Sequence, residues 1–174
     1  GWEEHQEQRQ TLSTFITKSS LYELQSPDIG GQGKHDLSAL FLERVFKIAE
    51  DESHVSIILP NKIFVGTNAS DLRSRLLTKT ALQNIITFEN KGIFDIDDRH
   101  KFGILTFKNS GSTDALHGKF LQRDVDVLKD IEETAFDIPL AVLKQYSPRV
   151  RIFPQVETQE ELELIKRIIQ HPSM

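Results

Sequence analysis

Three short apolar runs, each bounded by polar or turn-forming residues, constrain the fold of this chain most strongly. They span residues 54–59, 82–88 and 102–107. Their lengths are typical of strands. The first run is almost continuously apolar, which predicts a strand covered on both faces. Apolar residues at helical spacing precede it over residues 36–50 and follow it from residue 68 or 70 onward. This alternation of helix and strand indicates an α/β sheet.

The second and third runs have no helical pattern between them. We therefore expect these two strands to pair antiparallel at the edge of the sheet. Their connection, residues 89–101, contains Gly92 and Phe94. A connection of this length without secondary structure of its own is often functional.

The remaining segments predict helices separated by breaks. Residues 2–18 have the pattern of a polar helix, and the glycines and proline of residues 19–34 predict a loop. The character changes after residue 112, where we expect an acidic helix over 124–136, a proline-interrupted stretch and a last helix over 157–170. These features predict an α/β segment at residues 1–120 and a mainly helical connector at residues 121–174.

Composition and charge exclude several classes of protein. The chain has 174 residues and no cysteine, so thiolate metal sites and cysteine nucleophiles are excluded. No apolar run reaches the roughly 20 residues that span a bilayer. The polar start is unlike a signal peptide, and we expect a cytoplasmic protein. The net charge of −5 argues against a DNA-coating protein, although a local basic face can coexist with an acidic average.

Phe94 is the candidate functional residue with the clearest chemistry. An aromatic ring on a turn is exposed unless something covers it. Enzymes that act on a base in duplex DNA flip the base out and hold it against flat or apolar groups. Stacking on an aromatic ring stabilises a bound base by roughly 1–3 kcal/mol. The alternative is that Phe94 folds back and caps the core of the sheet.

Several segments occur in an order that resembles the post-catalytic half of large, single-chain N6-adenine DNA methyltransferases. This class includes type IIG restriction–modification enzymes and related phage-defence methyltransferases. The similarity covers roughly residues 36–119. It is carried by five segments: Leu37 to Phe41 with Glu43-Arg44, Ser56-Ile57-Ile58-Leu59-Pro60, Leu72-Arg73 with Leu76-Leu77, Phe88-Glu89-Asn90-Lys91-Gly92-Ile93-Phe94, and Lys101-Phe102-Gly103-Ile104-Leu105-Thr106.

The resemblance implies a partial Rossmann-like methyltransferase sheet, made of its last three strands with flanking helices. In the family, S-adenosylmethionine binds the first half of the sheet, and an Asn/Asp-Pro-Pro-aromatic tetrapeptide follows the fourth strand. This chain has neither that tetrapeptide nor a Gly-rich cofactor loop. It therefore resembles a part that is inactive alone and has no catalytic residue of its own. A missing N-terminal half and double-stranded DNA are the implied partners.

The resemblance also implies roles for individual residues. Phe94 matches the aromatic position beside the flipped base, although the family often has proline where this chain has Asp95. Asp36 and Asn61 match positions near the cofactor pocket; their alternatives are a helix N-cap and a polar turn residue. The candidates for DNA phosphate contact are the cations Lys62, Arg73, Lys91, Arg99 and Lys101. Such contacts position a duplex without reading its sequence.

Two other functions remain open from the sequence. A non-enzymatic α/β interaction module predicts weak DNA association that is insensitive to salt, whereas a methyltransferase part predicts association that falls steeply with salt. Asp97 and Asp98 raise a metal-dependent nuclease as a third reading, but no Glu-x-Lys or similar partner lies at usable spacing. The six histidines show no metal-ligand spacing either, so we expect no metal site.

Overall fold

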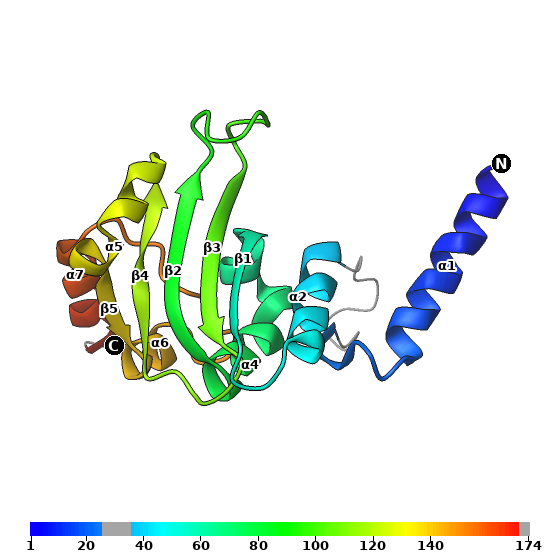
Figure 1. The fold of residues 1–174 in the computed structure, drawn as a ribbon, viewed down its shortest axis with the longest axis horizontal. Coiled ribbons are helices and arrows are strands. Elements are labelled where there is room, and N and C mark those ends of the chain that lie inside the picture. The colour runs from blue at the N-terminus through cyan, green and yellow to red at the C-terminus, as the bar shows by residue number, and fades with distance from the viewer. Residues whose placement is uncertain (26–35, 171–174) are drawn as a thin grey trace. The chain divides into compact units, whose positions relative to one another are not determined.

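The computed structural model describes residues 1–25 and 36–170. The chain divides into two compact units, Gly1–Ile48 and Ala49–Met174. Figure 1 gives the labels of their helices and strands. Within the described residues, no helix has both the length and the apolar character needed to cross a membrane. The loop predicted for residues 19–34 lies largely outside the described residues.

In its described residues, 1–25 and 36–48, the first unit contains two helices and one short 3-10 turn. The predicted polar helix is confirmed as α1 (Trp2–Lys18), with only Ile16 buried. The helix expected at residues 36–50 is α2 (Leu37–Ile48). Its buried face includes Glu43, whose Oε1 accepts the N–H of Leu24 at 2.9 Å. This bond joins α2 to the 3-10 turn η1 (Glu23–Gln25).

The second unit is built on a five-stranded sheet with the order β1-β3-β2-β4-β5. The three predicted strands are confirmed as β1 (His54–Pro60), β2 (Ala81–Glu89) and β3 (Lys101–Lys108). Two further strands, β4 (Ala115–Gln122) and β5 (Phe136–Pro139), were not expected from the sequence. The chain therefore has the α/β fold predicted, with more of the sheet present than the sequence indicated.

The directions of the strands bring the carboxyl ends of three strands to the same end of the sheet. β3 runs antiparallel to both β1 and β2, and β4 runs parallel to β2. Hence β1, β2 and β4 share one direction. The antiparallel pairing of β2 and β3 is confirmed, but its predicted place at the sheet edge is wrong, since both strands are interior. Ligand sites of α/β sheets gather at the carboxyl ends of the strands.

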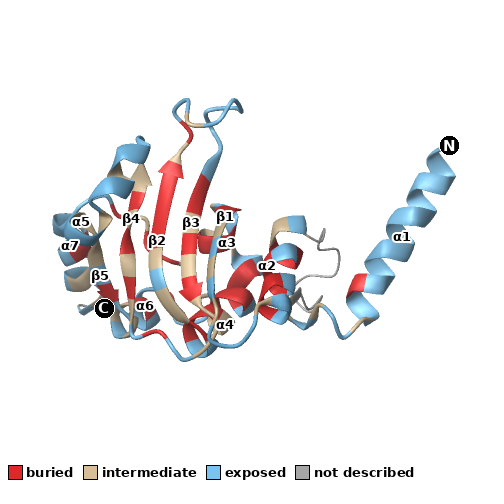
Figure 2. Ribbon diagram, viewed as in Figure 1, coloured by how far each residue is buried: buried red, intermediate tan, exposed pale blue. Residues whose placement is uncertain are grey.

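The burial of β1 also differs from expectation. β1 is an edge strand among the described residues, and its side chains alternate in exposure. Leu59 is buried, whereas Ile58 is 55% exposed. The prediction of a strand covered on both faces is wrong for β1. It fits β2 instead, whose consecutive residues 85–88 are all buried, so both of its faces are covered there (Figure 2).

Short helices connect several of the strands along the chain. α3 (Lys62–Val65), η2 (Thr67–Ala69) and α4 (Ser70–Lys79) connect β1 to β2. The acidic helix predicted over residues 124–136 is wrong. Asp124 caps a 3-10 helix, η3 (Val125–Lys129), by accepting the N–H of Asp126. The chain then forms α5 (Ile131–Thr134) and β5.

The C-terminal part mixes helix, strand and irregular chain. α6 (Leu140–Tyr146) follows β5, and the predicted last helix is confirmed as α7 (Gln159–Gln170). Between them, residues 147–158 have neither helix nor strand, yet Phe153 and Val156 are buried. β4 runs through residue 120 and belongs to the same sheet as β2. The functional division into residues 1–120 and 121–174 stays a prediction.

Candidate functional site

The loop of residues 90–100 leaves the carboxyl end of β2 and returns at the start of β3. Its Phe94 is 42% exposed. The ring packs edge-on against Phe102, with centroids 4.8 Å apart and planes at 62°. Phe102 in turn stacks on Phe88 at 5.2 Å and 14°. Phe94 is therefore supported from inside by two buried rings and remains partly open to solvent, rather than being enclosed in the core.

A side-chain amide organises the turn that carries Phe94. Asn90 is fully buried. Its Oδ1 accepts the N–H of Phe94 at 2.8 Å, and its Nδ2 donates to the carbonyl oxygens of Phe94 and Ile96 at 3.1 and 3.0 Å. Its backbone N–H donates to the carbonyl of His100 at 3.0 Å, which closes the loop. Gly92 has φ +79°, a conformation that glycine adopts without steric cost.

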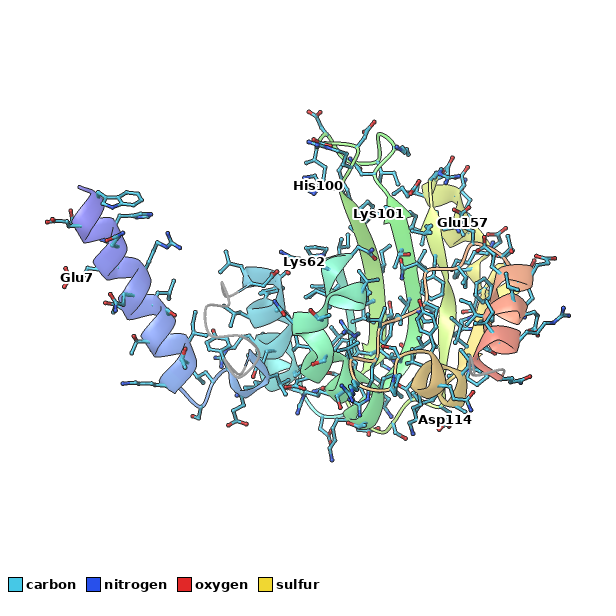
Figure 3. All side chains as sticks on the ribbon, turned by 180° about the vertical axis from the view of Figure 1, so that it is seen from behind. Glu7, Lys62, His100, Lys101, Asp114 and Glu157 are labelled. Atoms are coloured by element: carbon cyan, nitrogen blue, oxygen red, sulfur yellow. The ribbon has the colours of Figure 1, made fainter. Side chains whose placement is uncertain are left out.

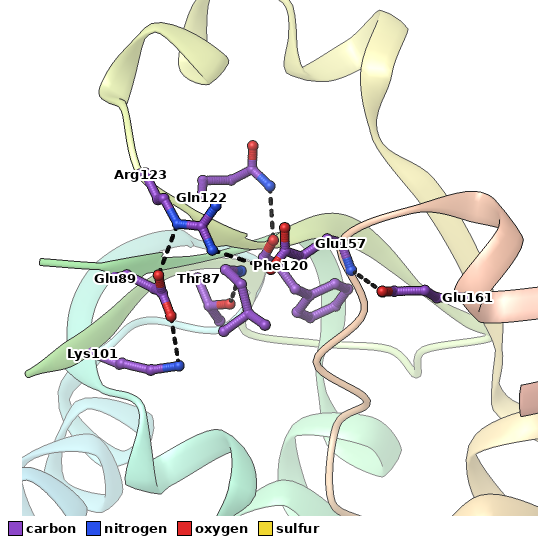
Figure 4. A network of polar contacts seen from close by, with 9 residues as sticks. Thr87, Glu89, Lys101, Phe120, Gln122, Arg123, Glu157 and Glu161 are labelled. Atoms are coloured by element: carbon purple, nitrogen blue, oxygen red, sulfur yellow. Dashed lines mark hydrogen bonds and ion pairs between the residues drawn. The ribbon is translucent and has the colours of Figure 1, made fainter. Parts of the chain in front are cut away.

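Ion pairs join the base of this loop to the neighbouring elements. Glu89, the last residue of β2, binds Lys101 at 2.8 Å and Arg123 at 2.9 Å. Arg123 also lies 3.4 Å from Glu157 (Figure 4). Hydrogen bonds from Lys101, which has the larger effect, and from Arg123 lower the pKa of Glu89 to about 2. The charge of Lys101 is thus partly engaged within the protein.

Replacing Glu89 with glutamine is expected to flatten the acid side of the stability profile. A carboxyl whose pKa falls on folding stabilises the protein above its unfolded pKa, and this contribution is lost as pH falls through the folded value. For Glu89 the window runs from the ordinary glutamate pKa of 4.5 down to the folded pKa of about 2. Urea midpoints measured from pH 7 to pH 2.5 should therefore fall less steeply in the variant.

The control for this experiment is Glu163→Gln. Glu163 pairs with a single lysine, Lys166, on the exposed face of α7, and that pair lowers its pKa. Its removal should change the acid profile less than the removal of Glu89, which binds two cations. A Glu89→Gln profile parallel to that of the unmodified chain at every pH would contradict the role assigned to this network.

The structure brings four of the five predicted DNA-contacting cations to the end of the sheet at which β1 and β2 have their carboxyl ends. Lys91 and Arg99 lie in the loop, and Lys101 begins β3. Figure 3 labels Lys101 and Lys62. Lys62 follows Asn61, whose backbone N–H donates to the carbonyl of Lys101 at 2.9 Å. All four side chains are exposed. Arg99 already binds Asp97 through two of its nitrogens, at 2.6 and 3.0 Å, which raises the pKa of Arg99.

The fifth cation, Arg73, is not available to DNA. Its side chain is fully buried. It donates to the carbonyl oxygens of Ile63, Val150 and Arg151 at 2.6 to 3.2 Å. Burial lowers the pKa of Arg73 to about 10, so the group stays charged at neutral pH. The predicted phosphate contact is wrong for Arg73, which instead fixes residues 147–158 against α3 and α4.

The two predicted cofactor residues have different surroundings. Asp36 precedes α2, where its Oδ1 accepts the N–H of Ser38 at 2.9 Å and its carbonyl accepts the N–H of Leu40. These bonds match the helix-cap alternative. Asn61 follows β1, and its Oδ1 is buried without a hydrogen-bond partner. A buried acceptor without a partner is uncommon in proteins and calls for an explanation.

Three residues of this site were missed from the sequence: Asn90, Glu89 and Arg123. The preference of asparagine for turns was the one local signal that pointed to Asn90. The ion pairs of Glu89 join β2, β3 and the end of β4, so the primary sequence gave no indication of them. Among the described residues, no group of three or more His, Cys, Asp or Glu side chains is placed to hold a metal ion.

Solved structures with a similar fold come from restriction–modification systems. A modification subunit assigned to a type I restriction enzyme from Vibrio vulnificus YJ016 matches 72% of this chain and 33% of its own, at 15% identity and a TM-score of 0.54. A structure of a type I restriction–modification system, described for its assembly and conformational transition, matches 80% and 37%, at 14% identity and a TM-score of 0.52. The chain thus spans about a third of their lengths.

These structural similarities show the fold alone. No curated protein matches the chain. The sequence itself, however, matches the model of the Eco57I restriction-modification methylase family over residues 6–94. That range is just over half of the chain, and it ends at Phe94. It also contains β1, α4, β2 and Asn90. The chain belongs to the Eco57I restriction-modification methylase family.

Proposed function

We propose that this chain is part of an S-adenosylmethionine-dependent DNA adenine-N6 methyltransferase of a restriction–modification or phage-defence system. It contributes the base-stacking turn and a DNA-facing surface, and it is inactive alone. The observation that carries the proposal is the half-exposed Phe94 ring on its aromatic support. A ring held in this way presents a flat apolar surface to an extruded base, as base-flipping enzymes require.

The surroundings of Phe94 suit double-stranded DNA as the partner. Exposed cations on the loop and at its base, Lys91, Arg99, Lys101 and Lys62, lie at the edge where the flipped base would enter. Phosphate contacts from such side chains fix the register of a duplex. The ion pairs of Lys101 and Arg99 with protein carboxylates are exchanged for phosphate contacts on binding.

S-adenosylmethionine fits this chain only in part. The buried, unpartnered Oδ1 of Asn61 at the carboxyl end of β1 suits a hydrogen-bond donor of a ligand. Asp36 has its carboxylate engaged by the start of α2. When bound, the cofactor supplies the methyl group. Asn61 contributes at most one contact to the cofactor, and the missing N-terminal half provides the rest of the pocket.

Methyl transfer tests the proposal directly. The chain alone, incubated with methyl-labelled S-adenosylmethionine and adenine-containing DNA, should incorporate no label, because it has no Pro-Pro tetrapeptide to align the amine. Addition of a polypeptide that carries the N-terminal half of the same methyltransferase should restore incorporation into the exocyclic amine of adenine. Robust labelling by the chain alone would contradict the proposal that the chain is inactive by itself. Labelling of cytosine by the combined polypeptides would contradict the proposal that adenine is the methylated base.

A further inference from the structure

We propose that Asn90 is the positioning residue of the base-stacking turn: it holds the Phe94 ring in its half-exposed place before any DNA is bound. This inference rests on the proposed function for its purpose, but its geometry stands by itself. Asn90 does not touch the base. It acts through the backbone on both sides of the ring.

The side chain of Asn90 hydrogen-bonds to the backbone of its own loop, four and six residues further along the chain. The side chain binds both the N–H and the carbonyl of Phe94, so the backbone of this single residue is fixed at both of its polar groups. The second Nδ2 hydrogen fixes the carbonyl of Ile96. Donors and acceptor are all used, which is what a fully buried amide requires.

Within residues 90–100, the side-chain hydrogen bonds to the backbone of Phe94 come from Asn90. The other side chains between residues 91 and 100 are exposed or half-buried. Their bonds, such as Asp97 with Arg99, lie beyond Ile96 and do not reach the backbone of Phe94. Without Asn90, the ring keeps its edge contact with Phe102, and the Phe94 carbonyl keeps the N–H of Ile96 at 2.8 Å, but the N–H of Phe94 loses its acceptor. A preorganised ring binds more tightly than a mobile one because less order is lost on binding.

Asn90→Asp is the most informative variant, with Asn90→Ser as a second. Aspartate has the same shape and still accepts the N–H of Phe94. It has no hydrogen to donate, however, and it turns a carboxylate toward the carbonyls of Phe94 and Ile96. We expect the turn to open. The matched control is Asn109→Asp, because Asn109 also donates its amide to a backbone carbonyl, that of Ala49 at 2.9 Å, but beyond the other end of β3.

A tryptophan reporter measures the position of the ring without DNA. The chain has a single tryptophan, Trp2, so Trp2→Phe with Phe94→Trp places the only indole at the turn. In this background Asn90→Asp and Asn90→Ser should shift the emission to longer wavelength and lower its anisotropy, while far-UV circular dichroism stays unchanged. Asn109→Asp should leave both signals as they are. An indole signal insensitive to both Asn90 variants would overturn the proposal.

A double-mutant cycle then links Asn90 to the base. The probe is a duplex with one 2-aminopurine opposite an abasic position, whose fluorescence is quenched on stacking. Asn90→Asp should weaken binding of the probe about tenfold, the effect of ordering one or two loop residues on binding, and should have no further effect in a Phe94→Ala background. Full additivity of the two changes would overturn the positioning role. A chain that binds no probe at all refutes the proposed function, whereas the indole measurement still decides the role of Asn90.

Discussion

Replacing Arg73 with leucine is expected to destabilise the second unit by about 4 kcal/mol, which is a large part of the stability of an ordinary domain. The guanidinium donates four hydrogen bonds to three backbone carbonyls. Leucine fills a similar volume but leaves the oxygens of Ile63, Val150 and Arg151 without a donor. Each buried group left unsatisfied costs roughly 1–3 kcal/mol. The sum should lower the urea midpoint strongly.

The consequence extends beyond Arg73 because residues 147–158 depend on it. This segment is also held by the N–H of Phe153, which donates to the carbonyl of Phe64 at 3.0 Å, and by the Thr87 hydroxyl, which donates to Gln155 Oε1 at 3.0 Å. We expect its backbone amides to exchange faster in the variant. Arg73→Lys should recover little, because an ammonium on a flexible stem does not reproduce the fixed fork of a guanidinium.

The matched control for Arg73 is Arg149→Leu. Arg149 is exposed and lies in the same segment, next to the carbonyl of Val150. Exposed substitutions of this kind change stability by about 0.5 kcal/mol or less. Urea unfolding followed by circular dichroism compares the two variants. Equal midpoints for Arg73→Leu and Arg149→Leu would show that the buried network is not what holds the segment in place.

Arg73 also shows where sequence reasoning fails. Its neighbours Leu72 and Leu76 have the spacing of an amphipathic helix, and α4 is present. An arginine beside such a stripe is usually solvated or binds an anion. Two of the three carbonyls that Arg73 binds, those of Val150 and Arg151, lie 77 and 78 residues later in the chain. The pattern within α4 contains no information about carbonyls so distant, so its burial was not predictable.

The missed strand β4 has a similar cause. Leu116, Gly118 and Phe120 are buried at alternate positions, but glycine weakens the apolar signal at the centre. Gly118 pairs with Ile85 of β2, and a Cβ at this position would collide with the Ile85 carbonyl oxygen. The residue that weakens the strand pattern is therefore the one that lets β4 approach β2. By contrast, β1, β2 and β3 each carry two adjacent large apolar residues at their centre, and these three strands were predicted.

The position of the turn that carries Phe94 was predictable from the sequence, but the side chains that support its ring were not. Gly92 and the polar residues around it are local turn signals, and they put the ring outside the sheet. The aromatic support of Phe102 and Phe88 comes from the pairing of β2 with β3. The sequence indicated that pairing, but not which side chains of the two strands meet beneath the ring.

Phe94→Ala is expected to weaken binding of an extrahelical 2-aminopurine by between about tenfold and a hundredfold. Stacking on one aromatic ring stabilises a bound base by roughly 1–3 kcal/mol, and about 1.4 kcal/mol corresponds to a factor of ten. The stability of the chain should change little, because Phe94 is 42% exposed in the DNA-free state.

Two matched variants separate stacking from a general loss of apolar surface. Ile96→Ala removes a 53% exposed aliphatic side chain two residues further along the same loop. Phe94→Tyr keeps an aromatic face. Fluorescence titration of the 2-aminopurine duplex should show a large loss for Phe94→Ala, a small one for Ile96→Ala and near-native affinity for Phe94→Tyr. If Phe94→Ala and Ile96→Ala lose affinity equally, the loop acts as an apolar patch, and the ring has no special role in holding a base.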